Sequence, residues 1–355
     1  MALEKLFTEF LSYFPLKVEA NNCVNQDNLK VCNRCEEVCP HGAIKLENNR
    51  PVVDFEKCTV CGLCLSECPV RVFDIEIDLT EFYKPKSRLL LGCYLSGRKP
   101  DVKVPCLAIF NEEILASFIL NGSQEVILDT EKCKSCPQKE NYEHIKRYVE
   151  GANLLLHYHR VDGQVREISE GEPLDGELDE REFLSSLFGK DEKREKPKVS
   201  KKINVPLWRQ LFFETVKRLP PENLCYQPVE EERLRFARVV IDDNRCKRSN
   251  VCSFWCPTKA LSADEKAVYF TQILCTDCGL CEKICPNSAV KLEKRFIPRH
   301  NVMAGKVVVG KGEKKVCKKC GREFIGPPEE ELCLYCRKDA EMERLMKEFL
   351  FGSRD

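Results

Sequence analysis

The chain has 355 residues, which is more than a single hydrophobic core usually supports, so we expect several domains. Its 57 basic residues balance 57 acidic residues, which excludes recruitment of nucleic acid or an anionic membrane by an overall field and leaves only local patches. No apolar run approaches the roughly 18 residues that cross a bilayer, and the first residues mix charged with apolar side chains, unlike a secretory signal. We therefore expect a cytoplasmic protein, in which reducing conditions make the 24 cysteines metal ligands rather than disulfides.

The first segment, residues 1–85, is predicted to hold a helix and an iron–sulfur module. Apolar side chains recur at helical spacing before Pro15 and predict a helix that covers a small core. Four cysteines then precede Pro69 in the spacing C-x2-C-x2-C-x3-C-P: Cys58, Cys61, Cys64 and Cys68. This spacing lets one loop place three thiolates around a cubane of iron and sulfide, while the fourth thiolate serves a neighbouring cluster. Two zinc knuckles are the alternative, although zinc sites rarely use this run of four.

The second segment, residues 86–162, alternates strand and helix patterns and predicts a small α/β unit. We expect buried strands at 88–92 and 125–129. We also expect one helix that begins after the cap Asn111 and another that begins near Tyr142. Four cysteines follow successive elements, in the turns where an α/β sheet gathers ligands: Cys93, Cys106, Cys133 and Cys136.

The end of this unit and the residues after it are predicted to be exposed. His157 and His159 could suggest a Rieske-type site, but neither is paired with a cysteine at the needed spacing, so we expect them on one exposed face of a strand. Residues 163–204 are rich in charge and contain few apolar groups to offset the cost of ordering. We interpret them as a linker.

The fourth segment, residues 205–300, repeats the order of the first. Apolar side chains at helical spacing precede Pro220, a lone Cys225 follows, and a complete cysteine string then ends before a proline: Cys275, Cys278, Cys281 and Cys285. The string ahead of it has serine at its second position: Cys246, Ser249, Cys252 and Cys256. This order predicts a helix and a second iron–sulfur module with one deficient site.

The last segment, residues 301–355, holds two cysteine pairs separated by twelve residues: Cys317, Cys320, Cys333 and Cys336. Two knuckles of this kind predict a tetrahedral zinc ribbon, with a rubredoxin-like single iron as the rival interpretation. Beyond them, an apolar stripe from Met342 to Leu350 predicts a terminal helix that either packs on the ribbon or docks a partner.

With these strings, residues 20–80 and 240–295 resemble dicluster ferredoxins of the bacterial type. The phrases CPHGAIKL, CPTKALSA and CPNSAVKL resemble the turn of helix and the return strand that follow each proline in that family. The resemblance implies one [4Fe-4S] cluster held by Cys39, Cys58, Cys61 and Cys64. It likewise implies one held by Cys256, Cys275, Cys278 and Cys281.

The first string of each module departs from the family pattern. Leu29 stands where the first ligand is expected, so a longer loop is predicted to bring in another cysteine, giving a [4Fe-4S] site of Cys23, Cys32, Cys35 and Cys68. In the second module Ser249 leaves three thiolates, which match the [3Fe-4S] cluster of family members that lack this cysteine: Cys246, Cys252 and Cys285. A [4Fe-4S] cluster completed by the Ser249 oxygen or by Cys225 is the alternative.

The central segment resembles the delta subunit of methyl-viologen-reducing hydrogenases in GCYLSG, VKVPCL and VILDTEKCKSCPQKENYEHIKRYV. That subunit passes electrons toward heterodisulfide reductase, and its cysteines hold a [2Fe-2S] cluster. The resemblance implies the same cluster for Cys93, Cys106, Cys133 and Cys136. Structural zinc is the alternative there.

The whole pattern predicts an α+β multidomain chain, in which two ferredoxin-like dicluster modules flank a small α/β unit and a zinc ribbon with a terminal helix follows. The expected cofactors are three or four [4Fe-4S] clusters, a [3Fe-4S] cluster if the deficient site stays open, a [2Fe-2S] cluster and zinc. No flavin, nicotinamide or phosphate-binding fingerprint accompanies them. We therefore expect a non-catalytic subunit that relays single electrons in a cytosolic oxidoreductase complex of the hydrogenase, formate dehydrogenase or heterodisulfide-reductase type.

The expected partners are catalytic redox subunits and a soluble ferredoxin. One alternative is a redox or iron sensor that binds nucleic acid through basic residues of the ribbon: Lys306, Lys311, Lys314, Lys315, Lys318, Lys319 and Arg322. We do not favour it, because no recognition helix or stacking aromatic stripe accompanies the lysines. Another is an enzyme that binds its substrate at an open cluster corner beside Ser249.

Overall fold

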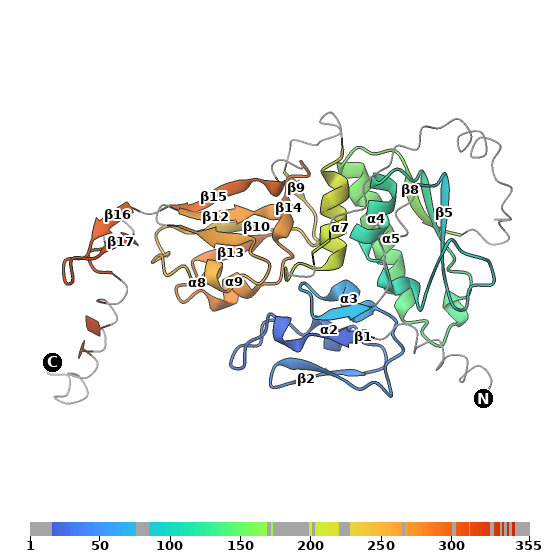
Figure 1. The fold of residues 1–355 in the computed structure, drawn as a ribbon, viewed down its shortest axis with the longest axis horizontal. Helices are drawn as coiled ribbons and strands as arrows, with labels where there is room; N and C mark the ends of the chain where they lie inside the picture. The colour runs from blue at the N-terminus through green and yellow to red at the C-terminus, as the bar shows by residue number, and fades with distance from the viewer. Residues whose placement is uncertain are drawn as a thin grey trace. The chain divides into compact units, whose positions relative to one another are not determined.

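The computed structural model describes residues 16–75, 85–168, 172, 199–200, 203–219, 228–264, 267–299, 303–311, 313–326, 330–333, 336, 339–340 and 343–344. The chain divides into two compact units (Figure 1): Met1–Arg235 with Ile297–Met303, and Phe236–Phe296 with Ala304–Asp355. Four features expected from the sequence lie wholly or mostly outside the described residues. They are the helix before Pro15, the linker 163–204, Cys225 and the apolar stripe of the terminal helix.

The first part of the first unit consists of short strands and helices joined by loops that carry cysteines. β1 (Leu16–Val18) pairs antiparallel with β4 (Phe73–Ile75), which ties the two ends of this segment together. β2 (Ile44–Glu47) and β3 (Arg50–Val53) form a hairpin. Its turn residues Asn48 and Asn49 both have positive φ, 49° and 62°, which suits a type I′ turn. The helical pieces are the 3₁₀ turn Ala20–Asn22, α2 (Arg34–Glu37) and α3 (Leu63–Glu67).

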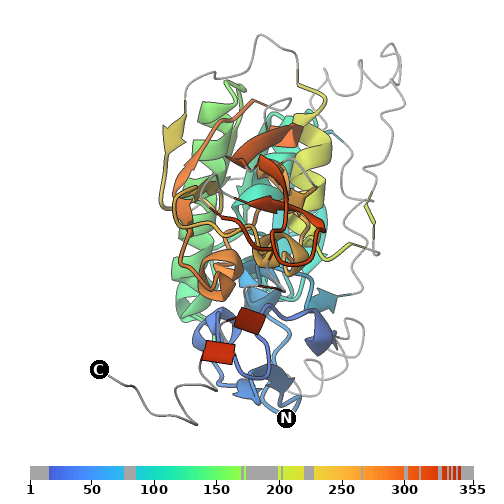
Figure 2. The ribbon, with the colours of Figure 1, turned by 90° about the vertical axis from the view of Figure 1, so that its left-hand side faces the viewer.

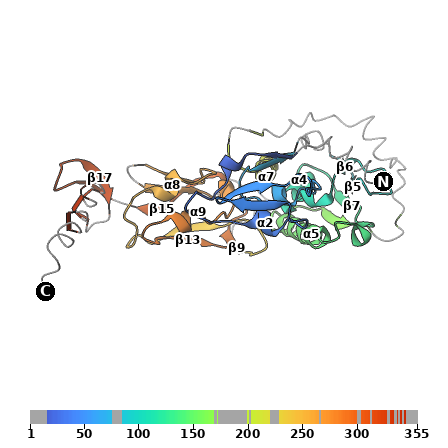
Figure 3. The ribbon, with the colours of Figure 1, turned by 90° about the horizontal axis from the view of Figure 1, so that it is seen from below.

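The α/β unit has a parallel sheet of strand order β6-β5-β7-β8. Its strands are β5 (Arg88–Cys93), β6 (Val102–Val104), β7 (Glu125–Leu128) and β8 (Gln164–Glu167). A 3₁₀ turn (Leu107–Ile109) precedes α4 (Glu112–Leu120), another (Cys133–Ser135) precedes α5 (Asn141–Tyr158), and Figure 3 shows both helices next to the strands. The Asn111 side chain accepts the Ile114 N–H at 3.1 Å, as an N-cap does. The elements predicted from residues 86–162 are therefore present.

Two elements differ from the boundaries that the sequence suggested. β8 lies inside the predicted linker 163–204, where it adds the last strand to the sheet by pairing with β7. α7 (Leu207–Val216) belongs to the first compact unit, whereas the sequence grouped it with the second module. α7 buries Trp208, Leu211 and Phe212 and packs beside α4 (Figure 2). The apolar stripe of α7 is thus part of a hydrophobic core, as the sequence predicted, but this core belongs to the first unit and not to the second module.

A network of buried charges joins these helices. Arg209 of α7 donates two hydrogen bonds to Glu113 of α4, both of 2.7 Å, and the two side chains are 1% and 0% exposed. Arg235 pairs with Glu112 of α4 at 3.1 Å and with Glu67 of α3 at 3.3 Å. Burying an unpaired charge costs on the order of several kcal/mol of folding free energy, so these side chains can be buried only because each is paired with an opposite charge. The network also links the ferredoxin-like segment to the α/β unit.

The prediction that His157 and His159 lie on one exposed face of a strand is wrong about the strand and about His159. His157 is exposed, but it lies in the last turn of α5, and His159 is fully buried directly after that helix. The His159 ring meets Phe212 of α7 edge to face at 5.6 Å between centroids, and neither ring nitrogen has a hydrogen-bond partner among the described residues. His159 is therefore a core side chain.

Burial lowers the pKa of His159 to about 4, because the charged imidazolium loses its hydration. Above pH 6.5 the ring is neutral in both the folded and the unfolded chain, so the folded state keeps its full stability. As pH falls below 6.5 the unfolded chain takes up the proton first. We expect a loss of about 2 kcal/mol between pH 7.5 and pH 5, measured by pulse proteolysis in urea. A His159→Phe variant should remove this part of the pH dependence, and an unchanged slope would contradict the assignment.

The second unit is built around two small antiparallel sheets. β10 (Arg238–Ile241) pairs with β13 (Val290–Glu293), and β12 (Ala267–Thr271) lies between β11 (Leu261–Ala263) and β15 (Lys306–Lys311). The other elements are α8 (Val251–Phe254), the 3₁₀ turn Gln272–Leu274, α9 (Leu280–Ile284) and β14 (Arg295–Phe296), while β9 (Val229–Glu230) belongs to the first unit. Val239, Phe270 and Val290 form its core together with Cys256 and Cys275. The cysteines are thus part of the hydrophobic core itself.

The first C-terminal cysteine pair lies in the turn of a hairpin, and the second pair follows its last strand. β16 (Glu313–Val316) pairs antiparallel with β17 (Glu323–Gly326). None of the helices in the described ranges combines the length and the apolar character needed to cross a bilayer.

Candidate iron–sulfur and metal sites

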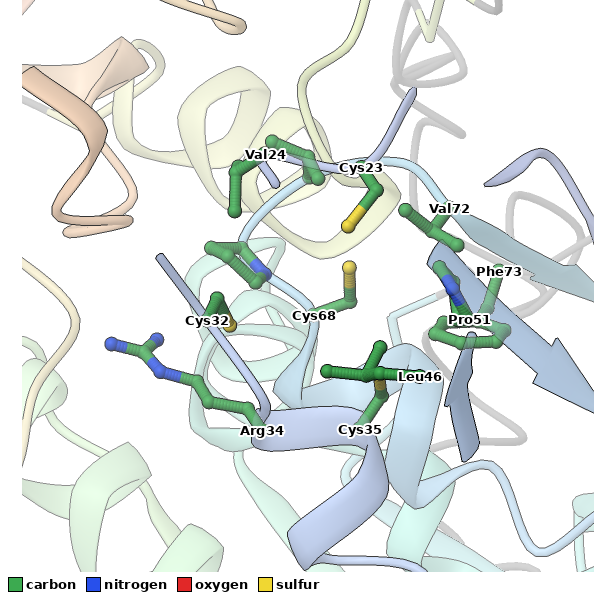
Figure 4. A pocket seen from close by; sticks show the side chains of 12 residues that line it. Cys23, Val24, Cys32, Arg34, Cys35, Leu46, Pro51, Cys68, Val72 and Phe73 are labelled. Carbon is green, nitrogen blue, oxygen red and sulfur yellow. The ribbon is translucent and has the colours of Figure 1, made fainter. Parts of the chain in front are cut away.

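The structure brings Cys23 together with the cysteines of the first string. One pocket is lined by Cys23, Cys32, Cys35 and Cys68. Figure 4 shows the sulfur atoms of Cys23 and Cys68 pointing toward one another, with Leu46 and Pro51 among the apolar side chains around them. Burial raises the pKa of Cys68 to about 12, and the neighbouring thiolates of Cys32 and Cys23 act in the same direction. Four thiols crowded in an apolar pocket suit a cluster, whose iron would stabilise the thiolate forms.

A second group gathers Cys39 with three cysteines that precede or begin α3: Cys58, Cys61 and Cys64. Burial, together with smaller contributions from the thiolates of Cys39 and Cys58, raises the pKa of Cys61 to about 11. The Ala43 N–H lies 3.3 Å from the Cys39 sulfur, which adds a hydrogen bond to that ligand. Burial also raises the pKa of Cys64, with contributions from its own group and from Cys35 and Cys68. The two groups of this segment are therefore neighbours.

The second unit shows the same grouping. Burial raises the pKa of Cys281, and the thiolates that raise it next are Cys275, Cys278 and Cys256. Burial raises the pKa of Cys252 to about 11, followed by the effects of Cys246 and Cys285. Backbone N–H groups donate to Cys256 from Leu261 (3.4 Å) and to Cys285 from Ala289 (3.3 Å). The four-cysteine group and the three-cysteine group are each assembled from two strings.

The loop that contains Ser249 has the same backbone conformation as the loops of the two complete cysteine strings. In the complete strings, the residues on either side of the second cysteine have positive φ: Val60 (51°) and Gly62 (81°), and Asp277 (53°) and Gly279 (79°). Arg248 (52°) and Asn250 (56°) flank Ser249 in the same way. A positive φ is rare for residues other than glycine, so the repeated pattern is specific. Ser249 therefore occupies the place of the second ligand, in a loop that keeps its shape without the cysteine.

This backbone predicts the result of restoring the cysteine. A Ser249→Cys variant is expected to bind about one more iron atom per chain and to lose the isotropic oxidised signal of a [3Fe-4S] cluster in electron paramagnetic resonance (EPR). Ser253→Cys is the matched control, because Ser253 lies in α8 beside Cys252 but outside the loop. Unchanged iron content and signal in Ser249→Cys would show that another group already completes the site.

The α/β unit gathers its four cysteines in one further pocket, lined by Cys93, Cys106, Cys133 and Cys136. Cys93 is the last residue of β5, Cys106 follows β6, and Cys133 and Cys136 follow β7. Burial raises the pKa of Cys133, and the thiolates of Cys106, Cys93 and Cys136 add to the rise. The Gln138 N–H lies 3.3 Å from the Cys136 sulfur. Sequence reasoning missed two polar residues of this pocket, Gln138 and Asn141.

The C-terminal group is the most compact one. The sulfur atoms of Cys317, Cys320, Cys333 and Cys336 all lie within 4.8 Å of one another. Three of these side chains are buried, and Cys320 is exposed. Four sulfur ligands at this separation can hold a single metal ion in tetrahedral coordination.

Comparisons with known proteins agree with this geometry. Residues 30–72 and residues 238–286 each match a family model described as a 4Fe-4S dicluster domain. The two segments are therefore ferredoxin-type iron–sulfur domains, whose chemistry is electron transport.

Three curated relatives are similar to short parts of the chain. A subunit of an ion-translocating oxidoreductase complex from Methanosarcina acetivorans is 41% identical over 44 residues, 12% of this chain and 17% of that protein. An uncharacterized ferredoxin from Methanocaldococcus jannaschii is 47% identical over 42 residues, 12% and 28%. Pyruvate synthase subunit PorD from Methanothermobacter marburgensis is 34% identical over 53 residues, 15% and 62%. The chain thus spans less than two thirds of each of these relatives.

Proposed function

We propose that this chain is an electron-transfer subunit that relays single electrons within a cytosolic oxidoreductase complex of the hydrogenase, formate dehydrogenase or heterodisulfide-reductase type. The observation that carries the proposal is the presence of five cysteine groups, each gathered in space from separate loops, in addition to the C-terminal group. Two of the similar proteins are named as subunits of larger oxidoreductases, which supports a partner that carries the catalytic site.

The chain's own residues set the conditions for this role. The Cys23, Cys39 and Cys256 groups would each hold a [4Fe-4S] cluster, the Cys246 group a [3Fe-4S] cluster, the Cys93 group a [2Fe-2S] cluster and the Cys317 group zinc. Such clusters supply reversible one-electron chemistry. The backbone N–H groups that approach Cys39, Cys136, Cys256 and Cys285 favour the more negative reduced state, since hydrogen bonds to sulfur raise the reduction potential.

The nucleic-acid alternative gains no support from the ribbon. Lys318 pairs with Glu331, and Lys319 pairs with Glu343 at 3.3 Å, so part of the basic stretch is balanced by carboxylates of the same segment. The enzyme alternative requires turnover by the isolated chain at the Ser249 corner. Steady-state assays of the chain alone, against assays with a partner complex, distinguish it from a relay.

Iron and sulfide analysis of anaerobically purified protein tests the proposal. Four cubanes and one binuclear cluster would give about 18 iron atoms per chain, or about one fewer with a trinuclear cluster. Dithionite should bleach the visible absorbance and produce EPR signals, and reoxidation should restore the oxidised spectrum. A colourless chain that binds only zinc, or iron that dithionite never reduces, would refute the relay.

A further inference from the structure

Within the first unit, the ferredoxin-like segment and the α/β unit approach one another closely at their cysteine sites. Gly62, directly after Cys61, lies so near Ile109 that a Cβ on the glycine would be 2.8 Å from the Ile109 Cβ. The Ser66 hydroxyl of α3 donates to the carbonyl oxygens of Ala108 (3.0 Å) and Ile109 (2.8 Å). Ser66 is fully buried. These contacts fix Cys61 against the 3₁₀ turn that begins one residue after Cys106.

Asn141 lies at this junction. It is the first residue of α5 and only 1% exposed, and its side chain lines the pocket of the four α/β cysteines. Its amide nitrogen is 3.6 Å from the Cys106 sulfur and 3.1 Å from the Gln138 side-chain oxygen. Because the Gln138 oxygen accepts from the Asn141 amide nitrogen, the N–H groups of Asn141, and not its side-chain oxygen, face the Cys106 sulfur. The amide oxygen has no hydrogen-bond partner among the described residues, so the nitrogen is the end that the structure uses.

Two ligands of different sites therefore lie at one junction. Cys61 directly precedes Gly62, and Cys106 directly precedes the turn Leu107–Ile109 that Gly62 and Ser66 contact.

We propose that Asn141 is a hydrogen-bond donor to the iron–sulfur site Cys93–Cys106–Cys133–Cys136, and that electrons cross between this site and the site Cys39–Cys58–Cys61–Cys64 at Cys61 and Cys106. This rests on the proposed function and adds the route. One electron moves from one site to the other, so one is oxidised and the other reduced, with no bond broken and no proton transferred. The Cys23 group, which neighbours the Cys39 group, then completes a linear order of three sites within the first unit.

The test compares two substitutions on the same helix. Asn141→Leu removes the donor to Cys106, and Asn153→Leu is the matched control, because Asn153 is a half-buried residue of α5 that bonds only backbone groups, at Val149 and Val165. Midpoint potentials are measured by EPR-monitored titration of the whole protein. We expect Asn141→Leu to lower the reduction equilibrium constant of the α/β site on the order of tenfold, which is about 59 mV for a one-electron couple. The Cys23 site should keep its potential, and Asn153→Leu should change none.

A second measurement needs no substitution at Asn141. In the reduced wild-type protein, the EPR signal of the α/β site should show faster relaxation or splitting as the Cys39 site becomes paramagnetic. A Cys133→Ser/Cys136→Ser variant, which deletes the α/β site, should simplify the remaining signals. Reducible clusters that show neither the shift of the α/β site in Asn141→Leu nor spin coupling would overturn the junction while leaving the relay intact. Zinc instead of iron at the α/β site would also overturn it, whereas loss of all iron would refute the proposed function itself.

Discussion

Removal of the metal from Cys317, Cys320, Cys333 and Cys336 is expected to unfold the hairpin β16–β17 and leave the rest of the chain folded. Among the described residues of this segment, the buried cluster consists of three of the ligands themselves with only Leu332 packed against them. An isolated two-stranded hairpin is marginally stable at best in water. Metal binding therefore supplies nearly all of its folding free energy, about 10–16 kcal/mol for structural zinc at neutral pH.

Amide hydrogen exchange with and without a zinc chelator measures this effect. We expect the β16–β17 amides to lose protection when zinc is removed, while the amides of β5 and β7 keep theirs. Cys333→Ala should reproduce the loss without chelator. Lys318→Met is the control, because it removes only an exposed ion pair with Glu331. Protection that survives complete loss of metal would show that the hairpin folds on its own.

The grouping of the cysteines can be predicted from the sequence, because its determinants are local. The C-x2-C-x2-C-x3-C spacing sets which thiolates one loop can present, and the structure places predicted groups of cysteines in common pockets. Even Cys23, which breaks the spacing, could be assigned, since a longer loop costs little. The backbone around Ser249 could not be predicted, because arginine rarely adopts the positive φ that Arg248 has, and an asparagine such as Asn250 adopts it only in some turns.

Sequence reasoning failed where a residue's role depends on a partner far along the chain. β8 carries too few apolar residues to stand out from the charged stretch after it, and it becomes a strand because β7 offers free hydrogen-bonding groups. α7 looks like a copy of the helix expected before the first module, but its buried face fits α4. Asn141 has the appearance of an ordinary residue at a helix start, and only the approach of Cys106 gives it a further role.

Arg209 is the clearest case of a residue that sequence alone misplaces, and it leads to the second large prediction. An arginine within an apolar stripe would usually reach water, yet this one is fully buried against Glu113, 96 residues away along the chain. Arg209→Met is expected to destabilise the first unit by about 3–5 kcal/mol, because it leaves the Glu113 carboxylate buried without its partner. The free energy of unfolding is measured by pulse proteolysis in urea under anaerobic conditions.

The double variant Arg209→Met/Glu113→Leu distinguishes this mechanism from simple loss of packing. With both charges removed, no unpaired carboxylate remains, so the double variant should be clearly more stable than Arg209→Met alone. Lys217→Met on the same helix is the matched control, since Lys217 pairs with Glu214 at 2.6 Å but is 43% exposed, and its loss should cost less than about 1 kcal/mol. A double variant as unstable as the sum of its single substitutions would show that shape, and not charge pairing, holds α7 against α4.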